Sequence, residues 1–249
     1  MPALYGIIGY PLSHTFSPAY FRKKFAEQNI DAVYEPFPIE EVTSFPALLA
    51  ASPNLEGLNI TIPYKETIIP YLDELDTLAA EIGAVNCIAI RNGIKKGYNT
   101  DAIGFEQSLV PLLTPQHTLA LILGTGGSSK AVAYVLRQLG IAFQFVSRVY
   151  KDGCLMYEDL SPEIITAHKL IINTTSLGMY PNIDAAPAIP YVAITPHHLL
   201  YDLTYNPEET KFLTLGKEQG ASVKNGFEML QLQAEAAWDI WTSGNNVPE

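Results

Sequence analysis

The sequence has little cysteine and little basic charge, and each shortage argues against a class of protein. Its two cysteines, Cys87 and Cys154, stand far apart, so neither a disulfide framework nor the spacing of a metal site is indicated. There are 15 Lys and Arg against 26 Asp and Glu, which gives a net charge of −11. This acidic balance argues against binding to nucleic acid or to an anionic membrane.

The sequence also lacks a long apolar run. No stretch is long enough to span a bilayer. The N-terminus has no basic region followed by an apolar core and a cleavage site, so we expect no signal peptide and a cytoplasmic location. With 249 residues, 48% hydrophobic and 16% charged, the chain has enough apolar material for one large domain or two small ones.

The clearest pattern that is present lies in residues 118–148. An apolar run leads into Gly124-Thr125-Gly126-Gly127-Ser128-Ser129, and an apolar-periodic run and a second apolar run follow. A strand, a glycine turn, a helix and a strand of this size form a βαβ unit. Glycines at such a turn let a diphosphate lie against backbone amides at the positive end of a helix. An ordinary βα turn is the alternative.

The residues after the second strand indicate which dinucleotide would bind. An NAD site usually has an acidic side chain there, which bonds the ribose 2′-hydroxyl, whereas this chain has Ser147-Arg148. A guanidinium matches a 2′-phosphate that a carboxylate would repel. The pair therefore favours NADP, although Arg148 taken alone could also be a solvated residue after a strand.

The first hundred residues carry polar side chains in loops and at strand ends. Thr15 and Ser17 lie in a loop after an expected strand at 4–8, where both could aim hydroxyls at a ligand. Ser17 also fits the N-cap of a helix that begins at Pro18. His14, in the same loop, is typical of a packing residue rather than a catalyst.

A second group follows the expected strand at 55–61. Asn59, Thr61 and Lys65 stand at its carboxyl end, which is where ligands gather in open α/β sheets. Lys65 is expected to open a helix, where a positive charge is mildly unfavourable. This small penalty favours a functional lysine, and a lysine in such a place can donate a proton.

Two more polar residues lie around an expected β-hairpin whose tight turn is Asn92-Gly93. Asn86 stands in an apolar strand and therefore needs a hydrogen-bond partner. Asp101 follows the hairpin and could be only a helix cap. We expect a domain boundary near residues 99–104.

Together these segments resemble the shikimate dehydrogenase family. The resemblance is carried, in order, by Gly9-Tyr10-Pro11, His14-Thr15-Phe16-Ser17-Pro18, Asn59-Ile60-Thr61-Ile62-Pro63-Tyr64-Lys65, Gly83-Ala84-Val85-Asn86, Asn99-Thr100-Asp101-Ala102-Ile103-Gly104, Gly124-Thr125-Gly126-Gly127 and Asn173-Thr174-Thr175-Ser176-Leu177-Gly178-Met179. The order and approximate spacing match over nearly the whole chain, which is more specific than any one motif.

The resemblance implies an α/β protein of two domains with a cleft between them. Residues 1–100 plus 226–249 would form the substrate-binding domain, to which the last helix returns, and residues 101–225 a Rossmann-like NADP-binding domain. The implied reaction is the reversible NADPH-dependent reduction of 3-dehydroshikimate to shikimate, in the route to aromatic amino acids. Lys65 would donate the proton, and Asp101 would bond the same substrate hydroxyl and hold the lysine in place.

The resemblance also implies two sets of binding residues. Those for the substrate would be Thr15, Ser17, Asn59, Thr61, Asn86, Tyr205 and Gln233. Those for the cofactor would be Gly124, Thr125, Gly126, Gly127, Ser128, Ser147, Arg148, Asn173, Thr174, Leu203 and Gly226. No metal is implied, the only partners are small molecules, and the chain would be a monomer or a homodimer.

Three departures from the family pattern bear on specificity. Thr15 replaces a serine, Cys87 replaces a threonine, and Ser147-Arg148-Val149 replaces N-R-T, with the later basic residue displaced to Lys151. Two alternatives therefore stand beside the main interpretation. One is a quinate/shikimate dehydrogenase that uses NAD, and the other is a catalytically silent homologue that senses a nucleotide or a shikimate-like ligand.

Overall fold

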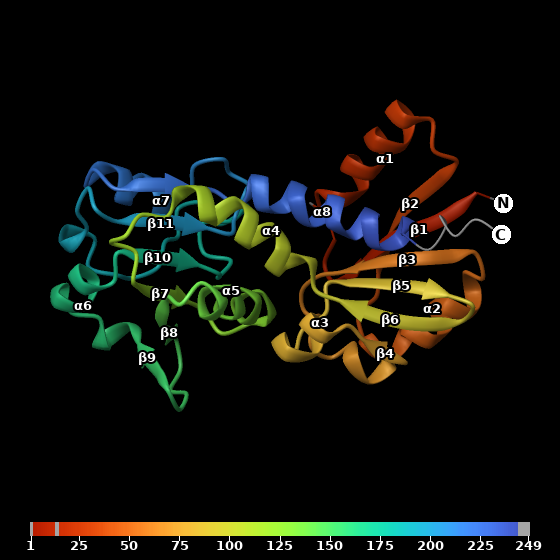
Figure 1. Ribbon diagram of the computed structural model, residues 1–249, viewed down its shortest axis with the longest axis horizontal. Coiled ribbons are helices and arrows are strands. Elements are labelled where there is room, and N and C mark those ends of the chain that lie inside the picture. The colour runs from red at the N-terminus through yellow and green to blue at the C-terminus, as the bar shows by residue number, and fades with distance from the viewer. Residues whose placement is uncertain (1, 13–14, 244–249) are drawn as a thin grey trace. The chain divides into compact units, whose positions relative to one another are not determined.

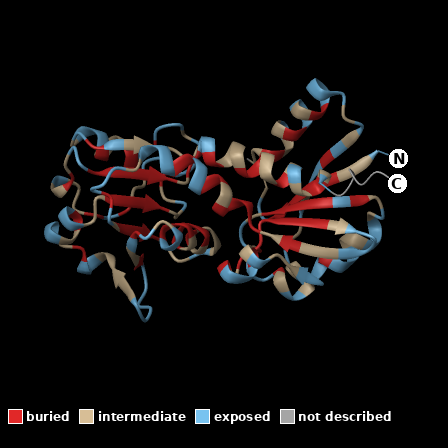
Figure 2. Cartoon of the chain, in the orientation of Figure 1, coloured by how far each residue is buried: buried red, intermediate tan, exposed pale blue. Residues whose placement is uncertain are grey.

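The computed structural model describes residues 2–12 and 15–243. The chain divides into an N-terminal unit, residues 1–100 and 234–249, and a central unit, residues 101–233. Each unit contains a six-stranded sheet with helices packed on it (Figure 1). The α/β class predicted from the sequence is therefore confirmed, and in both units the buried residues concentrate in the strands (Figure 2).

The N-terminal unit is built on a mixed sheet in the order β2-β1-β3-β5-β6-β4. Its strands are β1 (Ala3–Gly9), β2 (Ala32–Pro38), β3 (Leu55–Ile60), β4 (Glu74–Leu75), β5 (Cys87–Arg91) and β6 (Ile94–Tyr98). β1 pairs in parallel with both β2 and β3, whereas β5 is antiparallel to β3 and β6. From β1 the chain continues to a strand on one side of it, and from β3 to strands on the other side. The place where the direction reverses, called the switch point, is therefore at the carboxyl ends of β1 and β3.

Alternation along these strands gives the sheet two apolar faces. One face packs on α1 (Ser17–Gln28) and on the second half of α8 (Phe227–Thr242), and the other on α2 (Phe45–Ala51) and α3 (Thr77–Ile82). Gly57 allows α8 to approach closely, since a Cβ at this position would lie 2.3 Å from the indole nitrogen of Trp241. That nitrogen donates to the carbonyl of Ile88 at 2.9 Å.

The central unit contains an entirely parallel sheet in the order β12-β11-β10-β7-β8-β9. Its strands are β7 (Leu119–Leu123), β8 (Ala142–Ser147), β9 (Cys154–Met156), β10 (Leu170–Asn173), β11 (Leu199–Asp202) and β12 (Ser222–Lys224). If β7 to β12 are numbered 1 to 6, the order is 6-5-4-1-2-3, which is that of a doubly wound dinucleotide-binding sheet. The strand order reverses between β7 and β10, and this is the switch point of the sheet.

Helices cover both faces of this sheet as well. They are α4 (Thr100–Leu109), α5 (Gly127–Gln138), α6 (Pro162–Ala167) and α7 (Lys211–Glu218). Phe212 and Leu213 of α7 and Ile165 of α6 pack with the core on one face. On the other face, Phe105 of α4 meets the ring of Tyr201 edge-on at 5.1 Å.

Two local expectations had different outcomes. The hairpin turn is confirmed, because Asn92 and Gly93 join β5 to β6 with φ values of 52° and 80°. The helix expected to open at Lys65 is wrong. Lys65 instead lies in a run of turns that precedes a short 3-10 helix, η2 (Ile69–Tyr71).

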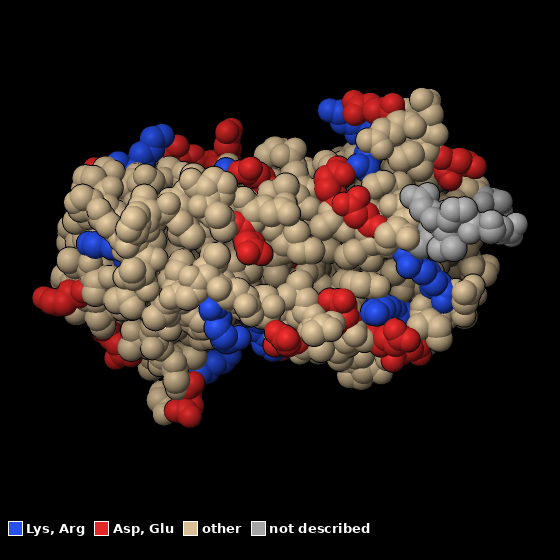
Figure 3. All heavy atoms as spheres, in the orientation of Figure 1, with Lys and Arg blue, Asp and Glu red and all other residues tan. Residues whose placement is uncertain are grey.

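Within the described residues, no helix combines the length and the apolar character needed to cross a membrane. On the face drawn in Figure 3, acidic and basic side chains are interspersed, and most of the surface is neither.

A histidine turn is repeated at the start of two central strands. Thr114-Pro115-Gln116-His117 precedes β7, and Thr195-Pro196-His197-His198 precedes β11. In both turns the histidine Nδ1 accepts from the threonine N–H at 3.0 Å. His198 Nε2 lies 2.9 Å from the carbonyl of Ile165. An accepting Nδ1 carries no proton, so both rings are held neutral.

These turns predict that acid weakens the central unit. Burial, and then for His198 the charge of Lys169, lowers the pKa of both rings. The stability that the two neutral rings contribute is fully present above the pKa of histidine in the unfolded chain, about 6.5. It is lost as the pH falls below that value toward the lower pKa values of the two rings in the folded protein. Urea unfolding between about pH 8 and pH 5 should show this decline, and His117→Gln and His198→Gln should each flatten it.

The matched control is His197→Gln, which changes an exposed ring next to His198 in the sequence. It should leave the pH dependence as it is in the parent. An equally steep decline in the double variant His117→Gln, His198→Gln would contradict the assignment.

Candidate functional site

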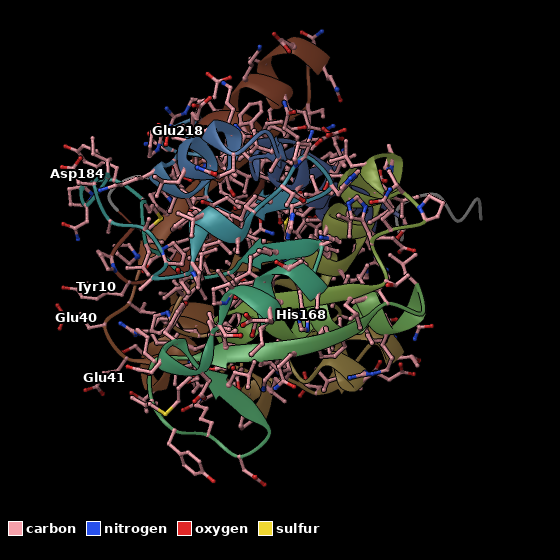
Figure 4. All side chains as sticks on the ribbon, turned by 90° about the vertical axis from the view of Figure 1, so that its left-hand side faces the viewer. Tyr10, Glu40, Glu41, His168, Asp184 and Glu218 are labelled. Atoms are coloured by element: carbon pink, nitrogen blue, oxygen red, sulfur yellow. The ribbon has the colours of Figure 1, made fainter. Side chains whose placement is uncertain are left out.

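The switch point of the N-terminal sheet brings together the segments that follow β1 and β3. The N–H of Thr61 donates to the carbonyl of Ile8 at 2.9 Å, and the N–H of Tyr10 donates to Ile62 at 3.2 Å. The loop after β1 is also tied to the segment after β2, because the Tyr10 hydroxyl donates to Glu40 at 3.1 Å (Figure 4). This edge of the sheet is the ligand-binding edge of an open α/β sheet.

The loop after β1 carries Thr15 and Ser17 to this edge. The Thr15 hydroxyl makes a long 3.4 Å hydrogen bond to the carbonyl of Leu12. The family-like motif here includes His14, which lies outside the described residues. Ser17 begins α1, whose N-cap is Phe16 with no side-chain capping bond, so the expectation that Ser17 caps this helix is wrong.

Ser17 instead lies beside a buried hydrogen-bonded pair. Tyr34 on β2 donates from its hydroxyl to Asn59 Oδ1 at 2.7 Å, and the Ser17 side chain acts on the same phenol, whose pKa it lowers. All three side chains are buried. Burial raises the pKa of Tyr34, so the phenol stays protonated and can donate.

The hydrogen bonds of Asn59 continue through Asn86. Asn59 Nδ2 lies 3.4 Å from the carbonyl of Asn86, and the Asn86 amide exchanges hydrogen bonds with Thr100. Asn86 Nδ2 donates to the Thr100 hydroxyl at 2.9 Å, and the Thr100 N–H donates back to Oδ1 at 2.6 Å. Asn86 directly precedes β5 and is buried, and Thr100 is the hydrogen-bond partner that the sequence led us to expect.

Lys65 and Thr61 complete the set in the N-terminal unit. Both are partly buried and lie in the segment directly after β3. The carbonyl of Lys65 accepts from the N–H of Val85 at 2.7 Å, which fastens the turn to the segment before β5. A Cβ on Gly9 would lie 2.4 Å from the Thr61 methyl, so the chain passes close to Thr61.

In the central unit, the glycine loop meets β10 at the switch point. Gly124 has φ of +112°, and a Cβ there would lie 2.6 Å from the Thr174 hydroxyl. Both the N–H and the hydroxyl of Thr174 donate to the carbonyl of Leu123, at 2.9 and 2.7 Å. Gly126 is the N-cap of α5, with no side-chain capping bond and open space where a Cβ would point. These features fit a diphosphate at the N-terminus of α5.

The end of β8 supplies the basic side chains. Ser147 is buried, and its Oγ accepts from the N–H of Val149 at 3.3 Å. Arg148 is exposed. Lys151 reaches the glycine loop, where its Nζ donates to the Thr125 hydroxyl at 2.7 Å. Two cations therefore stand at the end of the second strand, where a ribose 2′-phosphate would lie.

A buried carboxylate organises the loops after β10 and β11. Asp202 accepts from Asn173 Nδ2 at 3.0 Å, from the Thr204 N–H at 2.9 Å and from the Thr210 hydroxyl at 2.6 Å. Asn173 Oδ1 in turn accepts from the Thr175 N–H and hydroxyl at 3.0 and 2.6 Å. Burial raises the pKa of Asp202 while these hydrogen bonds oppose the rise. Asp202 and Thr210 were not among the residues predicted from the sequence, although an acid that ends an apolar strand was a visible signal.

The remaining predicted residues belong to the central unit. A Cβ on Gly226 would lie 2.1 Å from the Leu203 carbonyl, so this glycine allows the start of α8 to approach the loop after β11. Tyr205 is partly buried in that loop. Gln233 is buried on α8, where its Nε2 donates to Leu230 at 2.9 Å, and Asp101 is buried in the first turn of α4.

Comparison with known proteins gives concordant matches. Residues 7–88 match the family model for the shikimate dehydrogenase substrate binding domain. The NADP(+) shikimate dehydrogenase of Halothermothrix orenii is 39% identical over 95% of this chain and 90% of its own length. Two solved structures are similar over nearly the whole chain. The shikimate 5-dehydrogenase of Thermus thermophilus, in complex with NADP(H) and shikimate, has a TM-score of 0.86 at 28% identity, covering 99% of this chain and 95% of its own.

The second solved structure is the quinate dehydrogenase of Corynebacterium glutamicum in complex with NAD. Its TM-score is 0.84 at 26% identity, and the match covers 97% of this chain and 94% of the other. The same fold therefore occurs with a related acid and with the other nicotinamide cofactor.

The glycine loop predicts a specific loss of nucleotide binding. Gly124→Ala places a Cβ against Thr174, and we expect NADP to bind at least about tenfold more weakly, since removal of good phosphate contacts costs about 1.4 kcal/mol or more. Gly140→Ala is the control, because Gly140 also has positive φ, +70°, but has nothing within 4 Å of an added Cβ.

Both variants should lose about 1–2 kcal/mol of stability from the positive φ, and Gly124→Ala should lose more because its Cβ also meets Thr174. Only Gly124→Ala should lose affinity in a fluorescence titration with NADP. Equal NADP affinities for the two variants would argue against this loop as the diphosphate site.

Proposed function

The chain belongs to the shikimate dehydrogenase family, and from this premise we propose that it catalyses the reversible NADPH-dependent reduction of 3-dehydroshikimate to shikimate. The observation that carries the proposal is the placement of the predicted ligand residues. In the N-terminal unit most of them lie around the carboxyl ends of β1 and β3 of a mixed sheet, and in the central unit the glycine loop and the ends of β8 and β10 lie around the switch point of a parallel sheet. Such strand ends are where α/β proteins bind their ligands.

For the cofactor, we propose that the first turn of α5 receives the diphosphate and that Arg148 and Lys151 receive the 2′-phosphate. The open space beside Gly126, the uncapped start of α5 and the two cations support this assignment. Asn173, Thr174, Leu203 and Gly226 would line the nicotinamide half of the site. When bound, the nicotinamide supplies or accepts the hydride.

For the substrate, we propose that neutral hydrogen-bonding groups recognise the polyol. Ser17 and Thr15 would bond the carboxylate, and Asn59, Thr61 and Asn86 the ring oxygens, with Tyr205 and Gln233 as further contacts. A buried substrate hydroxyl left without a partner costs about 1–3 kcal/mol, so a polyol site needs many such groups. The burial of Ser17, Asn59 and Asn86 beside one another supports this role.

We propose that Lys65 moves the proton. Reduction of a ketone delivers a hydride to carbon and a proton to oxygen, and the reverse reaction needs a base for the hydroxyl proton. Lys65 stands in the segment directly after β3, close in sequence to Thr61. Asp101, which directly follows the Asn86-bound Thr100, would hydrogen bond the same substrate hydroxyl.

The proposal predicts the specificity of the purified protein. Oxidation of shikimate or quinate, with NADP or NAD, is followed at the nicotinamide absorbance. We expect rapid turnover with shikimate and NADP. Turnover with NAD should be far lower for either acid, because Arg148 and Lys151 follow β8 and no acid ends it. Quinate with NADP should also turn over less than shikimate if the proposed substrate is right.

Comparable turnover with quinate or NAD would instead assign the chain to the quinate/shikimate type. Tight NADP binding without turnover of either acid would point to a silent sensor.

The proton-transfer role predicts that Lys65→Met loses turnover and keeps affinity. General acid–base groups contribute about 10²- to 10⁴-fold, so kcat should fall by that range while the Kd for shikimate changes by less than about threefold. Lys23→Met is the control, since Lys23 is exposed on α1 and pairs with Glu27 on the same helix. Parallel losses of kcat and of shikimate affinity would show that Lys65 binds the substrate rather than transfers the proton.

A further inference from the structure

We propose that Tyr34 is a positioning residue that fixes the Asn59 amide so that its N–H, and not its oxygen, faces the substrate. This inference rests on the proposed function, because Asn59 is assigned there to a substrate oxygen. It adds a residue in the middle of β2 that carries no motif and that sequence analysis passed over.

The ring of Tyr34 is held rigidly in the core of the N-terminal unit. The residue is 3% exposed, and its ring stacks on Phe21 at 4.6 Å with an interplanar angle of 15°. Trp241 lies 6.3 Å away on the same apolar face. The phenol oxygen therefore has a defined position beneath the carboxyl end of β3.

The hydrogen bond from the Tyr34 hydroxyl determines which end of the Asn59 amide faces the substrate. Tyr34 donates at 2.7 Å to Oδ1, which occupies the amide oxygen. Nδ2 has two hydrogens, and among the described residues its only acceptor is the Asn86 carbonyl at 3.4 Å. One N–H is therefore available for a substrate oxygen. Without the phenol, only the long contact between Nδ2 and the Asn86 carbonyl opposes rotation of the amide, so the oxygen can turn outward and present an acceptor.

A second tyrosine separates this role from plain packing. Tyr5 of β1 is the register partner of Tyr34 across the β1–β2 pair, is 2% exposed and packs on the same aromatic face. Its hydroxyl donates to Glu56 at 3.0 Å rather than to a substrate residue. Tyr5→Phe and Tyr34→Phe therefore remove the same atom from the same layer, and only one of them touches Asn59.

The test compares these two variants in steady-state kinetics. We expect Tyr34→Phe to raise the KM for shikimate about 5- to 10-fold, the usual effect of one lost hydrogen bond with a partner left unsatisfied. The KM for NADP should stay at the parent value, and Tyr5→Phe should leave both constants unchanged. In an Asn59→Ala background, adding Tyr34→Phe should have no further effect on the shikimate KM, because Tyr34 acts through Asn59.

Asn59→Asp gives an independent test that leaves Tyr34 in place. An aspartate keeps the acceptor for the phenol and removes the N–H, so shikimate binding should weaken at least as much as in Tyr34→Phe. Shikimate affinity equal to that of the parent would overturn the proposal, because the N–H would then not be the group presented.

The outcomes separate this inference from the proposed function. A parent protein that does not oxidise shikimate with NADP removes the proposed function. An active parent in which Tyr34→Phe and Tyr5→Phe have the same shikimate KM leaves that function standing and overturns the role of Tyr34. Equal rises in the KM values for shikimate and NADP would also overturn it, since they would indicate a general structural effect.

Discussion

Buried side-chain amides and carboxylates at the carboxyl ends of strands need hydrogen-bond partners, and this need organises both units. An unsatisfied buried polar group costs about 1–3 kcal/mol. Asn59 near the end of β3 is satisfied by Tyr34, and Asn173 at the end of β10 by Asp202 and Thr175. The loops at the ligand-binding edges are therefore held by hydrogen bonds, and they keep one geometry without being buried under apolar side chains.

Asp202 shows that one buried carboxylate can hold several segments together. Its carboxylate receives hydrogen bonds from the ends of β10 and β11 and from Thr210, the N-cap of α7. The end of β10, which is 29 residues away in sequence, thus meets two segments that follow β11 at one buried acid. Replacing it with an apolar residue would leave three donors without an acceptor, so its cost exceeds that of a single lost bond.

The sequence predicted the α/β class, the glycine loop and the hairpin because periodicity and glycine chemistry act locally. The prediction that Ser17 caps α1 was wrong. Serine before proline often caps a helix, but here the Ser17 side chain interacts with Tyr34 instead. Lys65 was placed in a helix that is a run of turns, because nothing local distinguishes the two after Pro63. Tyr34 could not be found, since in a strand of aromatic and apolar residues its hydroxyl has no sequence signature, and its partner is 25 positions away.

The pairing of Tyr5 and Tyr34 on neighbouring strands also has an evolutionary consequence. Tyrosine and phenylalanine codons differ by a single base, and the exchange leaves the ring, and hence the packing on Phe21, in place. If Tyr34 positions Asn59 as proposed, substrate affinity depends on a hydroxyl that a single-base mutation can remove or restore while the core keeps its packing. A lineage carrying this fold would then be able to change the strength of substrate binding by one mutation in a buried strand.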